Sequence, residues 1–311
     1  MNIILTGPES NSVQSFYSVL VLLSQIDEVE PNISPLIFNK YGLQDLFNSI
    51  DRCYHVNSAS KCIREFEKVS RSVLDKSEYE LVDNFLKNIV SVEYEGMPFC
   101  DRSELNPLQT IQFERRRRKA KADKRKPEMG SMYIPVEYAR FISSCRDFLD
   151  QLIKKRIGQS AKYKLIRFDG IQSMPRSCSK IFSDSKIIYL NHDPRNLYSI
   201  FKKSKDPWLG KNPEDFSNWF KQSSRMLWDD LAGGKTTYII SYEEIIADTE
   251  TSLKNICEFL EVDCNFLDID DVKNSAYDSV NWYKKVLTKS ELQTIEHHCT
   301  GFLNPEYKFS K

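Results

Sequence analysis

The sequence has 311 residues, of which 41% are hydrophobic and 28% are charged, a balance typical of a folded soluble protein rather than a disordered chain. Lys plus Arg and Asp plus Glu both total 44, so the net charge gives no reason to expect a nucleic-acid or membrane partner. The longest apolar run, residues 19–23, is far too short to cross a bilayer, and no signal peptide precedes the first predicted strand. We therefore expect a cytoplasmic protein without a membrane span.

The chain begins with a predicted phosphate-binding arrangement. Residues 2–6 form a buried strand, residues 7–12 form a turn of small and polar residues, and apolar residues then recur at helical spacing from Val13 onward. Backbone N–H groups of such a loop can bind an anion, and the helix dipole assists. The loop has no Gly-Lys-Ser/Thr motif, and a helix start capped by Ser10 or Ser12 explains the same residues.

The next hundred residues contain one pronounced charge run. The acidic stretch 27–32 precedes a second predicted strand at 35–38, residues 41–90 are predicted to be helical, and residues 91–112 irregular. Residues 115–126 read Arg-Arg-Arg-Arg-Lys-Ala-Lys-Ala-Asp-Lys-Arg-Lys. This run can be a solvated helix or mobile loop, a basic lip for an anionic acceptor such as an acidic glycan, or a nucleic-acid patch. The last is disfavoured, because no stacking aromatic residues alternate with the charges.

Two later strands each end beside polar residues. After an amphipathic helix over residues 141–153, residues 163–168 form a strand that is followed by Asp169, whose simplest role is a turn or cap. Residues 186–190 form another buried strand, after which Asp193 occupies an N-cap position and Pro194 the first helical position. Because ligands bind at the carboxyl ends of parallel strands and helix N-termini attract anions, we predict an anion site here. The basic and hydroxyl side chains around this junction are His192, Arg195 and Ser199.

The final predicted strand, residues 237–241, runs directly into Tyr242-Glu243-Glu244 and a helix. Together with the earlier strands it predicts a mostly parallel sheet with helices on both faces, which is an α/β fold. The eight cysteines are dispersed without a Cys-x-x-Cys pair, so no zinc site is predicted and reduced thiols are expected. His297 and His298 are adjacent and therefore point to different faces of a helix, which disfavours a metal pair.

Three of these segments resemble sulfotransferases, the enzymes that use 3′-phosphoadenosine 5′-phosphosulfate (PAPS) as sulfuryl donor. The first is the strand followed by Asp193-Pro194-Arg195, which is similar to the 3′-phosphate-binding segment of that family. The second is Tyr242-Glu243-Glu244 followed by a helix that ends Glu-Phe-Leu-Glu-Val. The third is Trp282-Tyr283-Lys284-Lys285, where the family has a loop that closes on the donor. The resemblance implies a P-loop-like three-layer fold, a single domain over residues 1–311, and a helical and basic insertion at about residues 41–135.

The resemblance also implies site roles. The 5′-phosphosulfate would be held by the loop residues Ser10, Asn11, Ser12 and Val13. The 3′-phosphate would be held by His192, Arg195 and Ser199, with Trp282 and Lys284 or Lys285. The base that deprotonates the acceptor hydroxyl would be a carboxylate, Glu30 or otherwise Asp169. The chain departs from the family pattern at Glu9, Asn11 and His192, and Ser199 comes one residue early.

The expected reaction is transfer of the sulfuryl group from PAPS to a hydroxyl, with a carbohydrate as the favoured acceptor, PAP (adenosine 3′,5′-bisphosphate) as product and no metal. The altered phosphate loop leaves open an inactive binding protein with the same fold. A nucleotide-dependent kinase is a weaker alternative, because the phosphate-loop lysine is absent. The sequence leaves the oligomeric state open.

Overall fold

The structure is a computed structural model, and its described part forms two compact units. The described residues are 1–7, 26–28, 36–37, 40–51, 56–96, 108, 111, 114–115, 118, 130–157, 162–169, 180–182, 184–205, 209–231, 236–263 and 283–303. One unit combines Met1–Ser34 with Ile153–Lys311, and the other is Pro35–Leu152. The single-domain organisation with an insertion at 41–135 stays a prediction.

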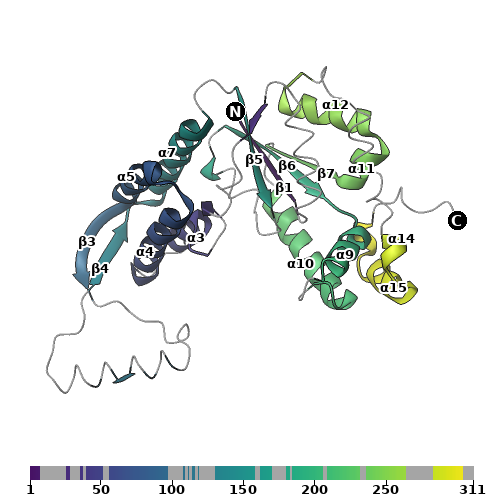
Figure 1. Ribbon diagram of the computed structural model, residues 1–311, viewed down its shortest axis with the longest axis horizontal. Helices are drawn as coiled ribbons and strands as arrows, with labels where there is room; N and C mark the ends of the chain where they lie inside the picture. The colour runs from purple at the N-terminus through teal and green to yellow at the C-terminus, as the bar shows by residue number, and fades with distance from the viewer. Residues whose placement is uncertain are drawn as a thin grey trace. The chain divides into compact units, whose positions relative to one another are not determined.

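The first unit is built on a parallel sheet of five strands (Figure 1). In the order in which they pair, the strands are β2 (Ile26–Glu28), β5 (Tyr163–Asp169), β1 (Asn2–Gly7), β6 (Ser185–Asn191) and β7 (Thr237–Ser241). Every pairing between neighbours is parallel. The predicted α/β class with a mostly parallel central sheet is therefore confirmed.

Both faces of the central strands are buried, as the continuous apolar runs in the sequence predict. On one face Leu5 and Leu190 belong to a core that includes α11 (Tyr242–Ala247) and α12 (Thr249–Leu260). On the other face, Ile4 lies opposite Ile166 and Ile187 in the strand registers, and all three side chains are buried. The sheet is thus the middle layer of the unit.

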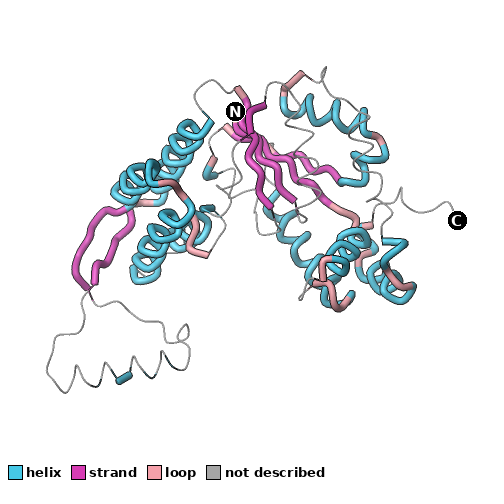
Figure 2. The backbone as a smooth tube through the Cα atoms, in the orientation of Figure 1, coloured by secondary structure: helices cyan, strands magenta, loops and turns pink. Residues whose placement is uncertain are grey.

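A second apolar cluster surrounds the helix that follows β6. This helix, α9 (Pro194–Lys203), packs with α10 (Pro213–Leu231), α15 (Lys289–His298) and the short turn η3 (Thr300–Phe302). Figure 2 shows these helices gathered beside α14 (Tyr283–Val286). The fully or nearly fully buried members of the cluster are Leu197, Tyr198, Phe216, Phe220, Ile295 and Cys299.

The second unit packs helices around aromatic side chains and carries a two-stranded antiparallel ribbon. Its helices are α3 (Leu43–Asp51), α4 (Val56–Val73), η1 (Lys76–Glu78), α5 (Tyr79–Ile89) and most of α7 (Tyr138–Ile157). Its strands are β3 (Val90–Gly96) and β4 (Gly130–Pro135). Phe85 stacks on Phe148 at 4.8 Å between ring centroids, and Phe66 meets both rings edge-on. The outer edge of β4 is covered by α4, whose Ser60 hydroxyl bonds to both backbone groups of Tyr133.

Two sequence expectations in this unit are wrong. Leu36 and Ile37 are helical rather than part of a strand at 35–38, because a short buried apolar run fits either structure and its periodicity cannot decide. The segment 91–112 is not irregular throughout, since β3 occupies its beginning. The alternation Val-Ser-Val-Glu-Tyr-Glu is typical of a strand and should have indicated it. Most of the basic run 115–126 lies outside the described residues; Arg115 and Arg118 are described and exposed.

Within the described part of the chain, no helix is long and apolar enough to cross a membrane, and no cluster of His, Cys, Asp or Glu side chains is arranged to hold a metal ion. Cys62, Cys145 and Cys299 are free and buried. Cys257 is disulfide-bonded, so the expectation of reduced thiols is wrong for this residue. Its position in the chain carries no sequence signal for pairing, because cysteine spacing does not define which thiols meet in the fold.

Candidate functional site

The carboxyl ends of three neighbouring strands meet where the sequence predicts an anion site. In the parallel registers, Gly7 at the end of β1 lies opposite Asp169 at the end of β5, and Thr6 lies opposite Tyr189 of β6. The start of the predicted phosphate loop, the Asp169 position and the β6–α9 junction therefore come to one edge of the sheet. Asn191 of β6 is also paired with Ser241, which brings the end of β7 to the same edge.

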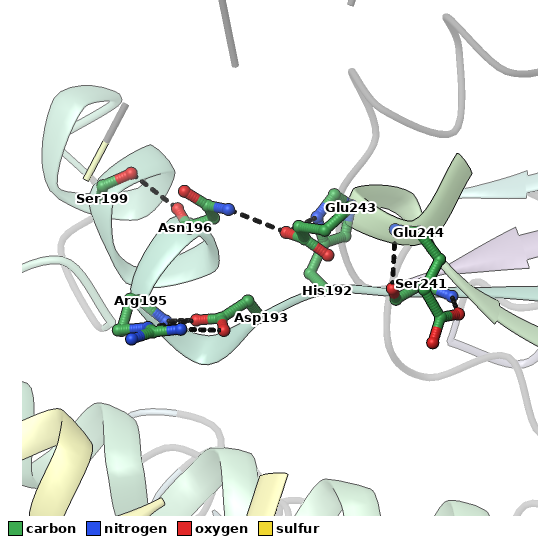
Figure 3. Close-up of polar contacts among 8 residues, drawn as sticks. All are labelled: His192, Asp193, Arg195, Asn196, Ser199, Ser241, Glu243 and Glu244. Atoms are coloured by element: carbon green, nitrogen blue, oxygen red, sulfur yellow. Dashed lines mark hydrogen bonds and ion pairs between the residues drawn. The ribbon is translucent and has the colours of Figure 1, made fainter. Parts of the chain in front are cut away.

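The β6–α9 junction has the predicted capped geometry (Figure 3). Asp193 is extended, with φ −60° and ψ 128°, and its Oδ1 accepts a hydrogen bond from the Arg195 backbone N–H at 2.9 Å. Pro194 occupies the first helical turn, where its missing N–H costs no hydrogen bond. This local sequence therefore starts α9 directly after the strand.

The Arg195 side chain turns back onto the cap residue. Its Nε donates to Oδ1 of Asp193 at 2.9 Å and its Nη2 to Oδ2 at 2.6 Å, which is a bidentate ion pair. Its Nη1 donates to Oε1 of Glu296 on α15 at 3.1 Å, and the guanidinium lies 5.1 Å from the ring centroid of Tyr283 on α14. The side chain is 1% exposed. Burial lowers the pKa of Arg195, but Asp193 outweighs this effect and holds the pKa above its usual range.

A second buried polar group joins β6, α9 and α11. Glu243 is fully buried, and its Oε1 accepts a hydrogen bond from Nδ2 of Asn196 at 2.9 Å. Nδ1 of His192 lies 3.5 Å from the same oxygen, which is ion-pair distance rather than a hydrogen bond (Figure 3). Burial by itself would raise the pKa of Glu243, but His192 and Asn196 hold it below its usual value. The imidazole also packs against the Tyr242 ring, with 5.2 Å between centroids.

The β7–α11 turn explains why Glu243 reaches this position. Ser241 caps α11 through a capping box: its hydroxyl accepts from the Glu244 N–H, and the Glu244 carboxylate accepts from the Ser241 N–H, both at 3.0 Å. Because Ser241 pairs with Asn191 in the sheet, the first turn of α11 starts beside the β6–α9 junction. The buried carboxylate of Glu243 is thereby presented to His192.

The other described residues that were predicted for the phosphate site are Ser199, which is buried in α9, and two exposed lysines on α14. Ser199 is fully buried, and its hydroxyl donates to the Asn196 carbonyl one turn back at 2.7 Å. Lys284 and Lys285 are exposed on α14, next to the buried Tyr283.

Several predicted site residues lie outside the described part of the structure. These are Ser10, Asn11, Ser12, Val13, Glu30 and Trp282. Asp169 is described only as the last residue of β5. The two proposed bases therefore remain predictions.

The predicted phosphate-binding residues differ in how well their contacts suit a donor phosphate. Nε2 of His192 is buried without a hydrogen-bond partner among the described residues, so this atom suits a buried ligand group. The exposed Lys284 and Lys285 suit an anion as well. The contacts of Arg195 and Ser199, in contrast, are made within the protein, and they do not fit a direct phosphate contact.

Sequence reasoning missed four residues that complete these groups. Glu243 and Asn196 hold His192, while Glu296 and Tyr283 hold Arg195. The sequence indicates Tyr242-Glu243-Glu244 as a motif, but it carries no signal that the Glu243 carboxylate is buried beside His192. Neither Glu296 nor Tyr283 carries a local signal, since Glu296 lies 101 residues from Arg195.

Comparisons with known proteins agree with the resemblance. Residues 174–266, which contain the β6–α9 junction and the Tyr-Glu-Glu segment, match the family model described as "Sulfotransferase family". No curated protein matches the sequence significantly.

Solved structures similar to the chain include the sulfotransferase domain from the curacin biosynthetic pathway, with 15% identity, 97% of this chain and 99% of that chain covered, and a TM-score of 0.46. They also include a sulfotransferase from Mycobacterium tuberculosis H37Rv, with 12% identity, 96% and 76% covered, and a TM-score of 0.43. Retinol dehydratase in complex with androsterone and inactive cofactor PAP has 11% identity, 99% and 82% covered, and a TM-score of 0.37. The family match covers residues 174–266, the segment that carries the β6–α9 junction, and shows that this segment is similar to the sulfotransferase family.

Proposed function

We propose that the protein transfers the sulfuryl group of PAPS to a hydroxyl group of an acceptor. The observation that carries this proposal is the family match over residues 174–266, which coincides with the capped β6–α9 junction at the carboxyl edge of the sheet. An anion site is expected at such a junction on physical grounds, independently of the match.

The reaction asks three things of this chain. It must align donor and acceptor, neutralise charge on the bridging oxygen, and accept the hydroxyl proton. When bound, PAPS supplies the sulfuryl group and leaves as PAP. In the proposal, residues 10–13 hold the 5′-phosphosulfate, and His192 with Lys284 or Lys285 and Trp282 holds the 3′-phosphate. Glu30, or otherwise Asp169, takes the proton, and no metal takes part.

The acceptor is proposed to be a carbohydrate, and the location cytoplasmic. The unit Pro35–Leu152 contains most of the predicted insertion, so we propose that it contributes the acceptor-specific part of the protein. The exposed Arg115 and Arg118 support an anionic acceptor, such as an acidic glycan.

A second candidate, a binding protein without transfer activity, is favoured by one observation. The guanidinium of Arg195, which the resemblance assigns to the donor phosphate, is held by Asp193 and Glu296 instead. A kinase remains the weaker alternative, since residues 7–12 lack the lysine of a phosphate loop.

Calorimetric titration separates these functions. A sulfotransferase should bind PAP with micromolar affinity and bind ATP·Mg²⁺ much more weakly, whereas a kinase should show the reverse preference. The double variant Lys284→Ala/Lys285→Ala should weaken PAP binding, and Lys289→Ala, which removes a neighbouring exposed lysine, should not. Binding of neither nucleotide by the unmodified protein would refute the transferase and favour the binding protein.

A further inference from the structure

Two cations on α9 face the C-terminal helices. Arg195 and Lys202 lie about two helical turns apart, so they project from the same side of α9. Arg195 contacts Glu296 and the ring of Tyr283, as described above. Nζ of Lys202 donates to both carboxylate oxygens of Glu291 on α15, at 2.8 and 2.7 Å, and to the Val286 carbonyl at 3.2 Å.

These contacts hold both ends of α14. Tyr283 is its first residue and lies under the Arg195 guanidinium, while Val286 is its last residue and accepts from Lys202. A helix of four residues is not stable by itself. The conformational free energy of nucleating a helix exceeds the stabilisation from the hydrogen bonds of a single turn. The contacts with the two α9 cations therefore help to fix the position of α14.

The charges around Arg195 argue against direct contact with a phosphate. One guanidinium faces two carboxylates, Asp193 and Glu296, and the side chain is 1% exposed. A phosphate dianion placed there would be repelled by the surplus negative charge and would have to displace a bidentate ion pair. The lysines that follow Tyr283 are exposed.

We propose that Arg195 and Lys202 are positioning residues: they clamp α14 so that Lys284 and Lys285 are placed for the 3′-phosphate of the donor. This inference rests on the proposed function. It changes the role of Arg195 from a ligand of the phosphate to a support for the residues that bind it.

The decisive variant is Glu296→Gln. The Glu296 side chain is about one-third exposed, at 32%, so the fold should tolerate the change. Glu296→Gln keeps an acceptor oxygen for Arg195 but removes the negative charge of the ion pair. The clamp predicts that affinity for PAP falls by up to about tenfold, while affinity for adenosine 5′-phosphate, which lacks the 3′-phosphate, stays the same. If Arg195 binds the phosphate directly, removing a competing carboxylate should leave PAP affinity unchanged or raise it.

Two further measurements separate positioning from general destabilisation. In the Lys284→Ala/Lys285→Ala background, Glu296→Gln should cause no additional loss of PAP affinity, because both changes act through the same lysines. Lys202→Arg should keep PAP affinity near that of the unmodified protein, whereas Lys202→Met should lower it. The matched control is Glu258→Gln, which alters an exposed glutamate on α12 and should have no effect.

Hydrogen exchange gives a readout that needs no donor. The amide of Leu287, which donates to the Tyr283 carbonyl at 2.9 Å, should exchange faster in Glu296→Gln, while α12 amides should not change. Unchanged exchange and unchanged PAP affinity in this variant would overturn the clamp with the proposed function intact. Failure of the unmodified protein to bind PAP would overturn the proposed function, and with it the donor-positioning role.

Discussion

Glu243 offers a quantitative prediction about the buried polar group that joins β6, α9 and α11. Its carboxylate accepts from Asn196 and faces His192, and all three side chains are at most 4% exposed. Glu243→Ala leaves the Asn196 amide without this acceptor, at a cost of about 1–3 kcal/mol, and also removes the charge that faces the imidazole. Breaking a buried pair by removing one partner typically costs about 3–5 kcal/mol, and we expect a loss in that range. Glu243→Gln keeps an acceptor oxygen and should lose about 1–2 kcal/mol.

The assay is urea unfolding followed by circular dichroism at pH 7 and at lower pH. The pKa of Glu243 lies below its usual 4.5, so its ionisation stabilises the fold above that pH, and the contribution disappears as pH falls through the lower folded-state pKa. The difference between the unmodified protein and Glu243→Gln should therefore shrink in acid. Glu258→Ala, an exposed change on α12, should stay within about 0.5 kcal/mol at pH 7. A loss below about 1 kcal/mol in Glu243→Ala would refute the reasoning.

Three further outcomes are expected. Leu190→Ala, at a fully buried position in β6, should lower the free energy of unfolding by about 2–5 kcal/mol in guanidinium titrations, whereas Ile134→Ala, at an exposed position in β4, should change it little. Burial would raise the pKa of Glu291, but Lys202 and Thr288 lower it below its usual value. Glu291→Gln should therefore cost about 1 kcal/mol at pH 7 in thermal melts, and the difference should shrink as pH falls below the usual pKa and disappear as it falls through the lowered pKa of the folded state. Burial raises the pKa of Cys145, so this thiol should resist iodoacetamide in the native protein and react once unfolded, as followed by mass spectrometry.

Each of these outcomes can fail in a defined way. Equal losses for Leu190→Ala and Ile134→Ala would mean that the central strand is not buried as described. A pH-independent effect of Glu291→Gln would contradict the ion pair with Lys202, and rapid native labelling of Cys145 would contradict its burial in α7.

Local signals were enough to predict four of the five sheet strands and the helix cap. The strands β1, β5, β6 and β7 are short apolar runs, of which β1 and β6 are buried on both faces and β7 is mostly half-buried. Asp193-Pro194 starts α9 through interactions within three residues. The strand β3 was missed although its alternation is local. The helical residues Leu36 and Ile37 were predicted to be a strand, because a short apolar run does not distinguish helix from strand.

The sequence by itself determined the α/β class, the capped junction and the resemblance to sulfotransferases, because each depends on neighbours along the chain. Only the tertiary structure decided what the junction side chains contact. Asn196 meets Glu243 across 47 residues, and Arg195 meets Glu296 across 101. The sequence predicts a guanidinium after the end of β6, but only the fold brings the Glu296 carboxylate to it beside that of Asp193. The negative charge of these two groups determines whether the guanidinium binds a phosphate or makes ion pairs within the protein.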